Sequence, residues 1–552
     1  MSKSKIVVLS DIHIGTNAPT VWYQKDLHEP YLVTVLDWVI NNASSVKELI
    51  LLGDIIDFWT YPPHEEPPSF DAIMAANPNL FGADGKLSEV MTALEGKVTY
   101  VRGNHDMTIT QEDLDKIQNP QGYKIKLSPG DIYYPLVENK KIVCTHGHIY
   151  TMFNAPFYDS NPIAPLPLGQ FITRAVAFMR SQQLKPGETV ADLKDSGDPG
   201  GWDIFPGIVE EIKKVIPDLL SGSNPQVSLS GLILDVIARS TQMSETQTIK
   251  LAHGQETTLQ EGKSIYANLW TQWKNKEGKS DAIKAIVADI NLHDVYLAWF
   301  AQKLAHQQSA ELVVMGHTHK PISGIKDFPI QYVNTGFNCP SKPDMGKKHP
   351  TFVQIDVEKS QGEIWQIIKE KDTYKVDTCF VEPIDNKAKI NMGQYEIELT
   401  IDPIENLDLI LKLLTYDKNY IMEVVNKTKY NLKYSGVKND SGIWTLRDIP
   451  ARTSLQEIVE ETSTVNTFSF GANYQVEGGS GFIQFSASWP TIGRRKINVG
   501  NINQSGDEPA KKVWDNMNDA NDKSCSNDSV KVRAFLKEEG KTIIWFYEVS
   551  EK

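Results

Sequence analysis

Residues 49–57 read LILLGDIID, an apolar run that ends in a Gly-Asp pair and a further aspartate. Four apolar residues bounded by a glycine predict a short buried strand, and Gly53 allows the tight turn that follows it. The turn would place Asp54 beyond the carboxyl end of the strand, where ligands gather in α/β sheets. There its two oxygens could bridge two cations. This stretch therefore predicts an α/β fold with a ligand site at one edge of its sheet.

Four other segments repeat this arrangement of polar donors after an apolar run. The five strands are expected at residues 6–9, 49–52, 98–101, 142–143 and 312–315, followed by Asp11 to His13, Asp54 to Asp57, Asn104 to Asp106, His146 to His148 and His317 to His319. Loops from distant parts of a chain converge at such an edge, so one pocket can collect all five segments. Asp11 and His13 are one residue apart, so both can reach one ion while Ile12 points into the core. Oxygen and imidazole donors without thiolates suit Mn, Fe or Zn ions, and geometry rather than affinity selects among these metals.

Composition narrows the class of protein. A chain of 552 residues is too long for one core, so at least two domains are expected. A hydrophobic content of 40% and a charged content of 23% are typical of soluble globular proteins. The net charge of -14 disfavours nonspecific binding of nucleic acid. The four cysteines form no C-x-x-C pair, so neither a structural zinc site nor a disulfide framework is indicated.

The start of the chain runs directly into a predicted strand, and no apolar stretch reaches the roughly 18 residues of a membrane span. We therefore expect a cytoplasmic protein, or one exported by a route that leaves no amino-terminal mark.

A long insertion is expected between the fourth and fifth donor segments, at about residues 155–310. It opens with the proline-rich residues 161–167, and helical periodicity recurs at residues 168–179, 208–219 and 282–304. Two interpretations are open. The apolar faces of these helices bury against one another and the core, or the helices form a cap that overhangs the donor segments and sets substrate choice.

After Gly316 the core is expected to resume with strands at residues 330–333 and 351–355. Charged, turn-rich sequence at residues 382–389 marks a boundary, and residues 395–401 then alternate between apolar and polar side chains. Similar strands are predicted at residues 481–487, 532–536 and 543–549. We expect a separate, mainly antiparallel all-β sandwich at residues 390–552, in which residues 501–528 form a solvated loop.

The five donor segments, in this order, resemble the metallophosphoesterase (calcineurin-like phosphoesterase) superfamily. The resemblance implies a four-layer αββα sandwich with two mixed sheets, which would occupy residues 1–385 together with the helical insertion. It also implies a dinuclear centre of two divalent or mixed-valence ions, most readily Mn, Fe or Zn. One ion would be held by Asp11, His13, Asp54 and His319, and the other by Asp54, Asn104, His146 and His317.

The same resemblance implies a reaction: a metal-bridging hydroxide attacks a phosphomonoester, a phosphodiester or a pyrophosphate. His105 would lie beside the phosphate, where it stabilises charge or protonates the leaving oxygen, and Asp106 would orient it. Asp57 is expected to support the ligands rather than to bind an ion. His148 either lines the pocket or has a structural role.

Departures from the superfamily limit the substrate prediction. Phosphoprotein phosphatases carry an arginine directly after the residue that corresponds to Asp57, whereas this chain has Phe58-Trp59. The segments resemble more closely the branch of lipid-linked pyrophosphate hydrolases and small phosphodiesterases, but that branch has a shorter insertion. The substrate is therefore predicted only as a phosphate ester that is a small molecule, a nucleotide or lipid-like.

The alternative function is membrane or lipid binding, in which the β domain carries the function and the phosphoesterase unit is accessory. Residues 426–428, 448–450, 468–470 and 479–486 faintly resemble aegerolysin-like or actinoporin-like sandwiches. Under this hypothesis Trp444, Trp489, Tyr474 and Phe482 are interfacial anchors, although burial in a core is the commoner fate of aromatic residues. A structural or oligomerising domain without a ligand is the simpler interpretation. Nothing in the sequence decides the oligomeric state.

Overall fold

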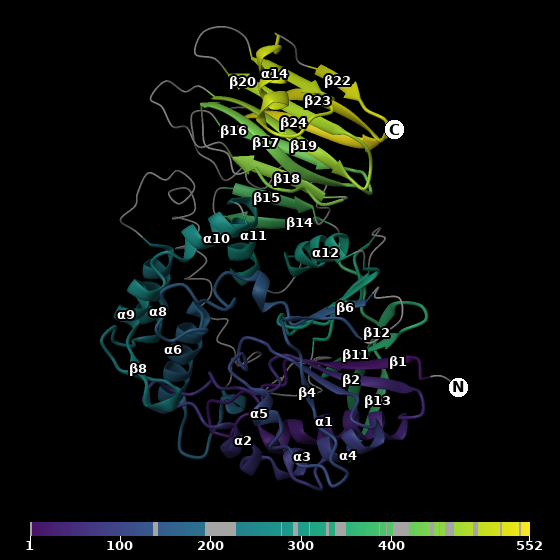
Figure 1. Ribbon diagram of the computed structural model, residues 1–552. Helices are drawn as coiled ribbons and strands as arrows, with labels where there is room; N and C mark the ends of the chain where they lie inside the picture. Colours follow the sequence, from purple (N-terminus) through teal and green to yellow (C-terminus); the bar gives the residue numbers. More distant parts are fainter. Residues whose placement is uncertain are drawn as a thin grey trace. The chain divides into compact units, whose positions relative to one another are not determined.

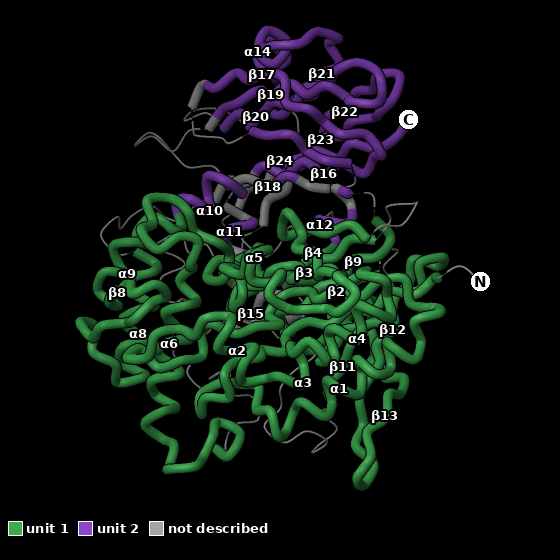
Figure 2. Tube along the Cα trace, turned by 60° about the horizontal axis from the view of Figure 1, so that its bottom comes forward, with its two compact units in different colours: residues 1–270, 285–301, 310–386 green, residues 271–284, 302–309, 387–552 purple. Residues whose placement is uncertain are grey.

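The computed structural model describes residues 3–552 except 136–141, 194–227, 278, 291–295, 309, 327–330, 337–348, 386, 393–394, 401–418, 442–445, 452, 459–467, 490–494, 519–521 and 540–541. The chain divides into two compact units (Figure 2). Unit 1 comprises residues 1–270, 285–301 and 310–386, and unit 2 comprises residues 271–284, 302–309 and 387–552.

Unit 1 contains a seven-stranded mixed sheet. Its strands, in spatial order, are β13 (Thr373–Thr378), β12 (Gln361–Glu370), β11 (Thr351–Asp356), β1 (Lys5–Leu9), β2 (Val46–Leu52), β3 (Val98–Val101) and β4 (Lys126–Leu127). The run from β1 to β4 is parallel, whereas β11 pairs antiparallel with β1, β12 with β11 and β13 with β12. Parallel pairing brings the carboxyl ends of β1, β2 and β3 to the same edge.

A second sheet of unit 1 has four strands in the order β10 (Gln331–Asn334), β9 (Leu312–Met315), β6 (Ile142–Thr145) and β5 (Ile132–Tyr133). The strands β6, β9 and β10 are parallel, whereas β5 is antiparallel to β6. With β1, β2 and β3, the strands β6 and β9 account for all five strands that the sequence predicts before a donor segment. The mixed α/β core is therefore confirmed.

The apolar strand sequences follow from burial on both faces. Ile6, Val8 and Leu52 belong to the same buried cluster as Cys144 and Val314 of the second sheet. The alternate residues of β1 and β2 pack instead with apolar side chains of α1 (Lys25–Asn41) and α4 (Lys86–Ala93). A strand with two buried faces has an unbroken apolar sequence rather than an alternating one.

The insertion is mainly helical. Its described helices are α6 (Leu168–Gln183), α8 (Leu229–Thr241), α9 (Leu259–Ile265), α10 (Leu269–Glu277), α11 (Lys279–Ile290) and α12 (Tyr296–Gln308), with a short hairpin of β7 (Ile249–Lys250) and β8 (Glu256–Thr257). Helices α6, α8 and α9 contact one another and lie side by side (Figure 1). The predicted helix at residues 208–219 lies outside the described residues. The single helix predicted at residues 282–304 is described as α11 and α12, and residues 291–295 between them are not among those described. The core of unit 1 also carries the short helices α2 (Phe70–Ala76), α3 (Pro78–Phe81) and α5 (Gln111–Leu114).

Unit 2 is rich in strands. It contains a hairpin of β14 (Lys387–Met392) and β15 (Tyr395–Thr400), a sheet in the order β18 (Thr453–Ile458), β16 (Asn419–Asn426), β24 (Thr542–Glu551), β23 (Val530–Glu539) and β22 (Asp522–Ser526), and a sheet in the order β17 (Asn431–Ser441), β19 (Phe468–Glu477), β20 (Phe482–Trp489) and β21 (Lys496–Gly500). Trp545 and Tyr547 of the five-stranded sheet share one apolar cluster with Phe470, Tyr474 and Phe485 of the four-stranded sheet. All described strand pairs are antiparallel except β16 with β24.

The prediction of a solvated loop at residues 501–528 is wrong. Helix α14 (Asp507–Asp515) and strand β22 lie within it. The helix carries Asp507 and Glu508 in its first turn, where carboxylates are favourable, and buries Ala510 and Val513. So few apolar positions are not visible as a periodic pattern within a polar stretch.

The candidate lipid anchors of the β domain have different environments. Tyr474 is fully buried, so it belongs to the core. Trp489 and Phe482 are half-buried, and the guanidinium of Arg495 lies 4.1 Å from the centre of the Trp489 ring. Trp444 lies outside the described residues. None of the described helices combines the length and the apolar character that a bilayer crossing requires.

Candidate metal centre

The donor segments leave their strands through turns with an unusual backbone. Asp11, His13, Asp54, His317 and His319 have φ values of 57°, 57°, 51°, 71° and 54°. Residues with side chains disfavour this left-handed region, and such strain concentrates at functional sites. Gly53 precedes Asp54, and a Cβ there would lie 2.6 Å from Cγ of His146. The turns hold these side chains in directions that a continued strand would not give.

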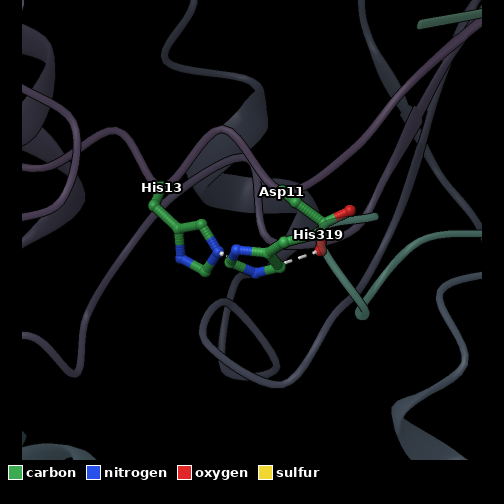
Figure 3. Close-up of side chains that lie close together, drawn as sticks. All are labelled: Asp11, His13 and His319. Atoms are coloured by element: carbon green, nitrogen blue, oxygen red, sulfur yellow. Dashed lines mark hydrogen bonds and ion pairs between the residues drawn. The ribbon is translucent and has the colours of Figure 1, made fainter. Parts of the chain in front are cut away.

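The first donor group comprises Asp11, His13 and His319 (Figure 3). Nε2 of His13 lies 3.1 Å from Nε2 of His319, which is 3.6 Å from Oδ1 of Asp11. The same oxygen of Asp11 accepts a hydrogen bond from the backbone N–H of His317 at 2.8 Å. Two imidazole nitrogens and a carboxylate oxygen that converge in this way suit one cation.

The second donor group comprises Asp54, His146 and His317. Nε2 of His146 lies 3.2 Å from Oδ2 of Asp54. Nδ1 of His146 is 2.8 Å from the carbonyl oxygen of Leu52, to which it can donate. Such a bond fixes the tautomer and leaves Nε2 as a ligand atom.

Asp54 lies between the two groups. Its Oδ2 is 3.2 Å from His146 of the second group and 3.9 Å from Nε2 of His13 in the first. Its Oδ1 accepts the backbone N–H of His105 at 2.8 Å. The carboxylate is therefore placed where one side chain can serve both groups.

Asn104 supplies an amide oxygen that lacks a partner. Among the described residues, its buried Oδ1 has no hydrogen bond, whereas its Nδ2 donates to Oδ1 of Asn154 at 3.4 Å. A buried acceptor without a donor is costly unless something unseen satisfies it. Because a cation would do so, the donor set fits metal binding.

Asp57 contacts both a donor and His105. Its Oδ2 lies 3.0 Å from Nδ1 of His13 and 3.1 Å from Nδ1 of His105, and its Oδ1 accepts the backbone N–H of Trp59 at 2.8 Å. Burial alone would raise the pKa of Asp57, but the neighbouring charge of His105 and the hydrogen bonds from His105 and His13 hold it well below its usual range. Asp57 is thus an ionised support for two imidazoles.

The structure differs from the prediction that Asp106 orients His105. Asp106 accepts hydrogen bonds from the Tyr100 hydroxyl at 2.5 Å, the Gly103 N–H at 2.6 Å and the Ile55 N–H at 2.9 Å. Burial and then the charge of Asp54 raise its pKa to about 6. Asp106 therefore ties two turns together, and the carboxylate beside the ring of His105 is that of Asp57.

Burial and neighbouring charges shift the pKa values of the histidines in different directions. Burial first, and the charge of another histidine second, lower the pKa of His317 well below its usual value. Burial and then His146 lower the pKa of His148 to about 3. His146 differs from these two, because the carboxylates of Asp54 and Asp11 outweigh burial and raise its pKa to about 9. His148 is fully buried 5.5 Å from the ring of His146, which favours its structural role.

A cavity of about 70 Å³ opens onto the donors. The core contributes Trp22, Asp54, Asn104, His105, His317 and His319, and the segment that follows residue 150 contributes Phe153, Asn154, Gly169, Ile172, Thr173, Val176 and Asp289. Helix α6 therefore forms a wall of the cavity, as the cap interpretation requires. Sequence reasoning missed Trp22, whose ring lies 4.5 Å from that of His13 and 5.1 Å from that of His105. It also missed Asn154 and Asp289, because neither belongs to a motif.

Carboxylate, imidazole and amide donors gathered at the strand ends of a mixed α/β core are the groups of a candidate metal-binding site. Residues 4–191 match the family described as calcineurin-like phosphoesterase. This part of the chain is a metallophosphoesterase domain, and the family is one of metal-dependent phosphoric ester hydrolases, as predicted. The match ends before His317 and His319, which the fold brings to the same site. No curated protein matches the chain.

Proposed function

We propose that the chain hydrolyses a phosphomonoester, phosphodiester or pyrophosphate at a dinuclear metal centre. The observation that carries the proposal is the position of Asp54 between two donor groups. Asp11, His13, Asp54 and His319 would hold one ion, and Asp54, Asn104, His146 and His317 the other. When bound, two such ions supply acidity to a water molecule and positive charge to the phosphoryl oxygens.

The chain's own groups position the substrate. His105 is nearly buried and lines the cavity, with one ring nitrogen beside Asp57. The ring of Trp59 lies 4.6 Å from that of His105 at an angle of 31°, so the imidazole is held between a carboxylate and an indole. The charges of Asp57 and Asp54 outweigh burial and raise the pKa of His105. A protonated His105 would stabilise charge on the phosphate or deliver a proton to the leaving oxygen.

Substrate choice would lie with the insertion. Ile172, Thr173 and Val176 of α6 project to the cavity, and the cavity is small. A phosphate group with a compact substituent suits this space better than a folded macromolecule does. Within the proposal, residues 1–385 form the phosphoesterase domain with its insertion and adopt the four-layer αββα arrangement. The β sandwich of residues 390–552 has a structural role, and its contact with lipid stays a prediction.

The test is hydrolysis of p-nitrophenyl phosphate and bis-p-nitrophenyl phosphate by metal-stripped protein that is refilled in turn with Mn²⁺, Zn²⁺, Fe²⁺, Ni²⁺ or Mg²⁺. The Asp54→Asn variant should lose at least about a hundredfold in activity, since even residues behind the ligands contribute 10- to 100-fold. Asp71→Asn is the matched control, because Asp71 pairs with Lys116 at the surface. The ratio of the two substrates reports monoesterase or diesterase preference.

Full activity of Asp54→Asn with unchanged metal content would contradict the assignment. Loss of activity in Asp54→Asn but not in Asp71→Asn would support it. If no metal restores hydrolysis of either ester by the wild-type protein, hydrolysis of small esters is excluded and flotation of the full chain with liposomes becomes the decisive experiment.

A further inference from the structure

The segment of residues 151–154 lies directly behind two of the proposed ligands. Oγ1 of Thr151 is 3.2 Å from Nε2 of His317, and Oδ1 of Asn154 accepts Nδ2 of Asn104 at 3.4 Å. If Nε2–H of His317 donates to Thr151, then Nδ1 of the ring is left for an ion. Both contacted residues belong to the second proposed ion, together with Asp54 and His146.

A single carboxylate from the insertion holds this segment. Asp289 of α11 accepts the backbone N–H of Phe153 through Oδ2 at 2.7 Å and Nδ2 of Asn154 through Oδ1 at 3.0 Å. Phe153 and Asn154 are thus tied to one side chain that is only 2% exposed. Burial raises the pKa of Asp289 well above its usual value, and the donors of this segment, Thr151 and Met152 among them, oppose that rise.

The bond between Asn154 and Asp289 settles which way the Asn154 amide points. Its N–H₂ group faces the carboxylate, so its oxygen faces Asn104. The Asn104 amide must then offer its own N–H₂ to Asn154, which leaves Oδ1 of Asn104 without a hydrogen bond from any described residue. A chain of amides that begins at Asp289 therefore ends in an oxygen that is free to bind a cation.

We propose that Asp289 is a positioning residue for the second metal ion: through Asn154 it orients Asn104, and by fixing Phe153 and Asn154 it holds the segment whose Thr151 contacts His317. The proposal rests on the proposed function, because it assumes that this donor group binds an ion. Asp289 lies about a hundred residues beyond the end of the family match at residue 191, so it is a contribution of the insertion. Helix α11 then completes the metal centre as well as covering it.

The experiment is a titration of the metal-stripped full-length protein with Mn²⁺. Equilibrium dialysis gives the number and affinity of bound ions, and electron paramagnetic resonance detects the exchange-coupled signal of a manganese pair. The wild-type protein should bind two ions per chain. Asp289→Ala should retain the first and bind the second about 10- to 100-fold more weakly, with loss of the coupled signal at subsaturating Mn²⁺. Asp289→Asn keeps one acceptor for Asn154, so its affinity for the second ion should lie between those of the wild-type protein and Asp289→Ala.

Two further variants test the contacts with Asn104 and with His317 separately. They also replace Asp289→Ala if that variant does not fold. Asn154→Ala removes the link between Asp289 and Asn104, and Thr151→Val removes the contact with His317 together with the bond to the carbonyl of His148. Each variant should weaken binding of the second ion and leave binding of the first unchanged. Asp235→Ala is the matched control, since Asp235 of α8 pairs with Lys263 of α9 in the same insertion. It should bind both ions as the wild-type protein does.

The outcomes distinguish this inference from the proposed function. If the wild-type protein binds fewer than two ions, the dinuclear proposal fails and this inference fails with it. If the wild-type protein binds two ions and the variants at Asp289, Asn154 and Thr151 do so with equal affinity, only the role of Asp289 is overturned. Weaker binding of the second ion alone in these variants supports both the dinuclear proposal and the role of Asp289.

Discussion

At the scale of single residues, the sequence could identify the donors but not every partner behind them. Asp11, His13 and Asp54 stand in motifs whose order carries the information. Asp57 was expected to support the ligands, and its contacts with His13 and His105 agree with that role. The assignment of Asp106 to the ring of His105 failed because neighbours in sequence need not be neighbours in space. Asp106 turns back to the amides of Gly103 and Ile55, and this depends on how two loops meet.

Glu48 provides a prediction for pH-dependent stability away from the metal centre. It is a buried carboxyl on β2 that accepts hydrogen bonds from the hydroxyls of Thr99 at 2.7 Å and Tyr133 at 2.6 Å. Burial outweighs these bonds and raises its pKa above the unfolded value. The folded state therefore holds this proton to a higher pH than the unfolded state does, and stability is lost as the pH rises from about 4.5 through the folded pKa.

Glu48→Gln keeps an acceptor for both hydroxyls and removes the ionisation. The variant should have a larger free energy of unfolding than the wild-type protein at pH 7.5, and the difference should shrink toward pH 4.5. Urea unfolding of both metal-stripped proteins at several pH values measures this. A variant that is less stable at pH 7.5, or a difference that grows on acidification, would refute the sign of the shift.

At the scale of elements, periodicity served well where a face or a pair of faces is buried. The core strands have unbroken apolar runs, and α6 shows its helical period clearly. The failures arise where tertiary contacts decide. Helix α14 has too few apolar positions to be seen, and Trp22 reaches the metal centre from a loop that carries no recognisable pattern.

Arg174 joins the insertion to the core at the level of elements. It projects from α6 and is fully buried. Its Nη2 lies within hydrogen-bond distance of four carbonyl oxygens, those of Pro62 at 3.0 Å, Pro63 at 3.4 Å, Glu65 at 2.5 Å and Lys250 at 2.9 Å. Burial lowers its pKa to about 10, so it remains charged at neutral pH. One guanidinium thus connects the cap helix, the loop after β2 and the hairpin of the insertion.

Arg174→Met should lower the free energy of unfolding by about 3 kcal/mol or more, because hydrogen bonds from a charged donor contribute about 1.5–3 kcal/mol each and this guanidinium makes several. Arg174→Lys retains the charge but not the planar fork, and should recover only part of the loss. Urea unfolding measures the stability, and proteolysis of the folded proteins shows whether the insertion opens first. Equal stability of the three proteins would mean that this connection contributes little.

At the scale of the whole molecule, the chain has two compact units, and the proposed ligands all belong to unit 1. A ligand that binds only the folded state stabilises the unit that binds it, by about 2.7 kcal/mol at a hundredfold excess over its dissociation constant. In scanning calorimetry, the midpoint temperature of the unfolding of unit 1 should therefore be higher in Mn²⁺ than in EDTA. The midpoint of unit 2 should be the same in both. Asp54→Asn should reduce the shift. A metal-dependent shift in unit 2, or none at all, would contradict the assignment of the ions.

The division of the chain into two compact units was the feature least predictable from the sequence. The change from an apolar α/β pattern to alternating strands after residue 390 predicted the strand-rich part. Segments 271–284 and 302–309 nevertheless cluster with that part, although they lie within the insertion. Asp281 and Lys303 from these two segments form an ion pair of 2.6 Å. Such long-range association depends on packing between distant segments, which local patterns do not report.

The left-handed turns at the donor segments have a consequence for how such a protein would change under mutation. Five of the seven proposed ligands hold a backbone conformation that costs residues with side chains about 1–3 kcal/mol each. Exchange of any of these residues for glycine would remove that cost together with the donor, so the donor set is held at the expense of the stability of the metal-free protein. Ions that bind only the folded state would offset the loss.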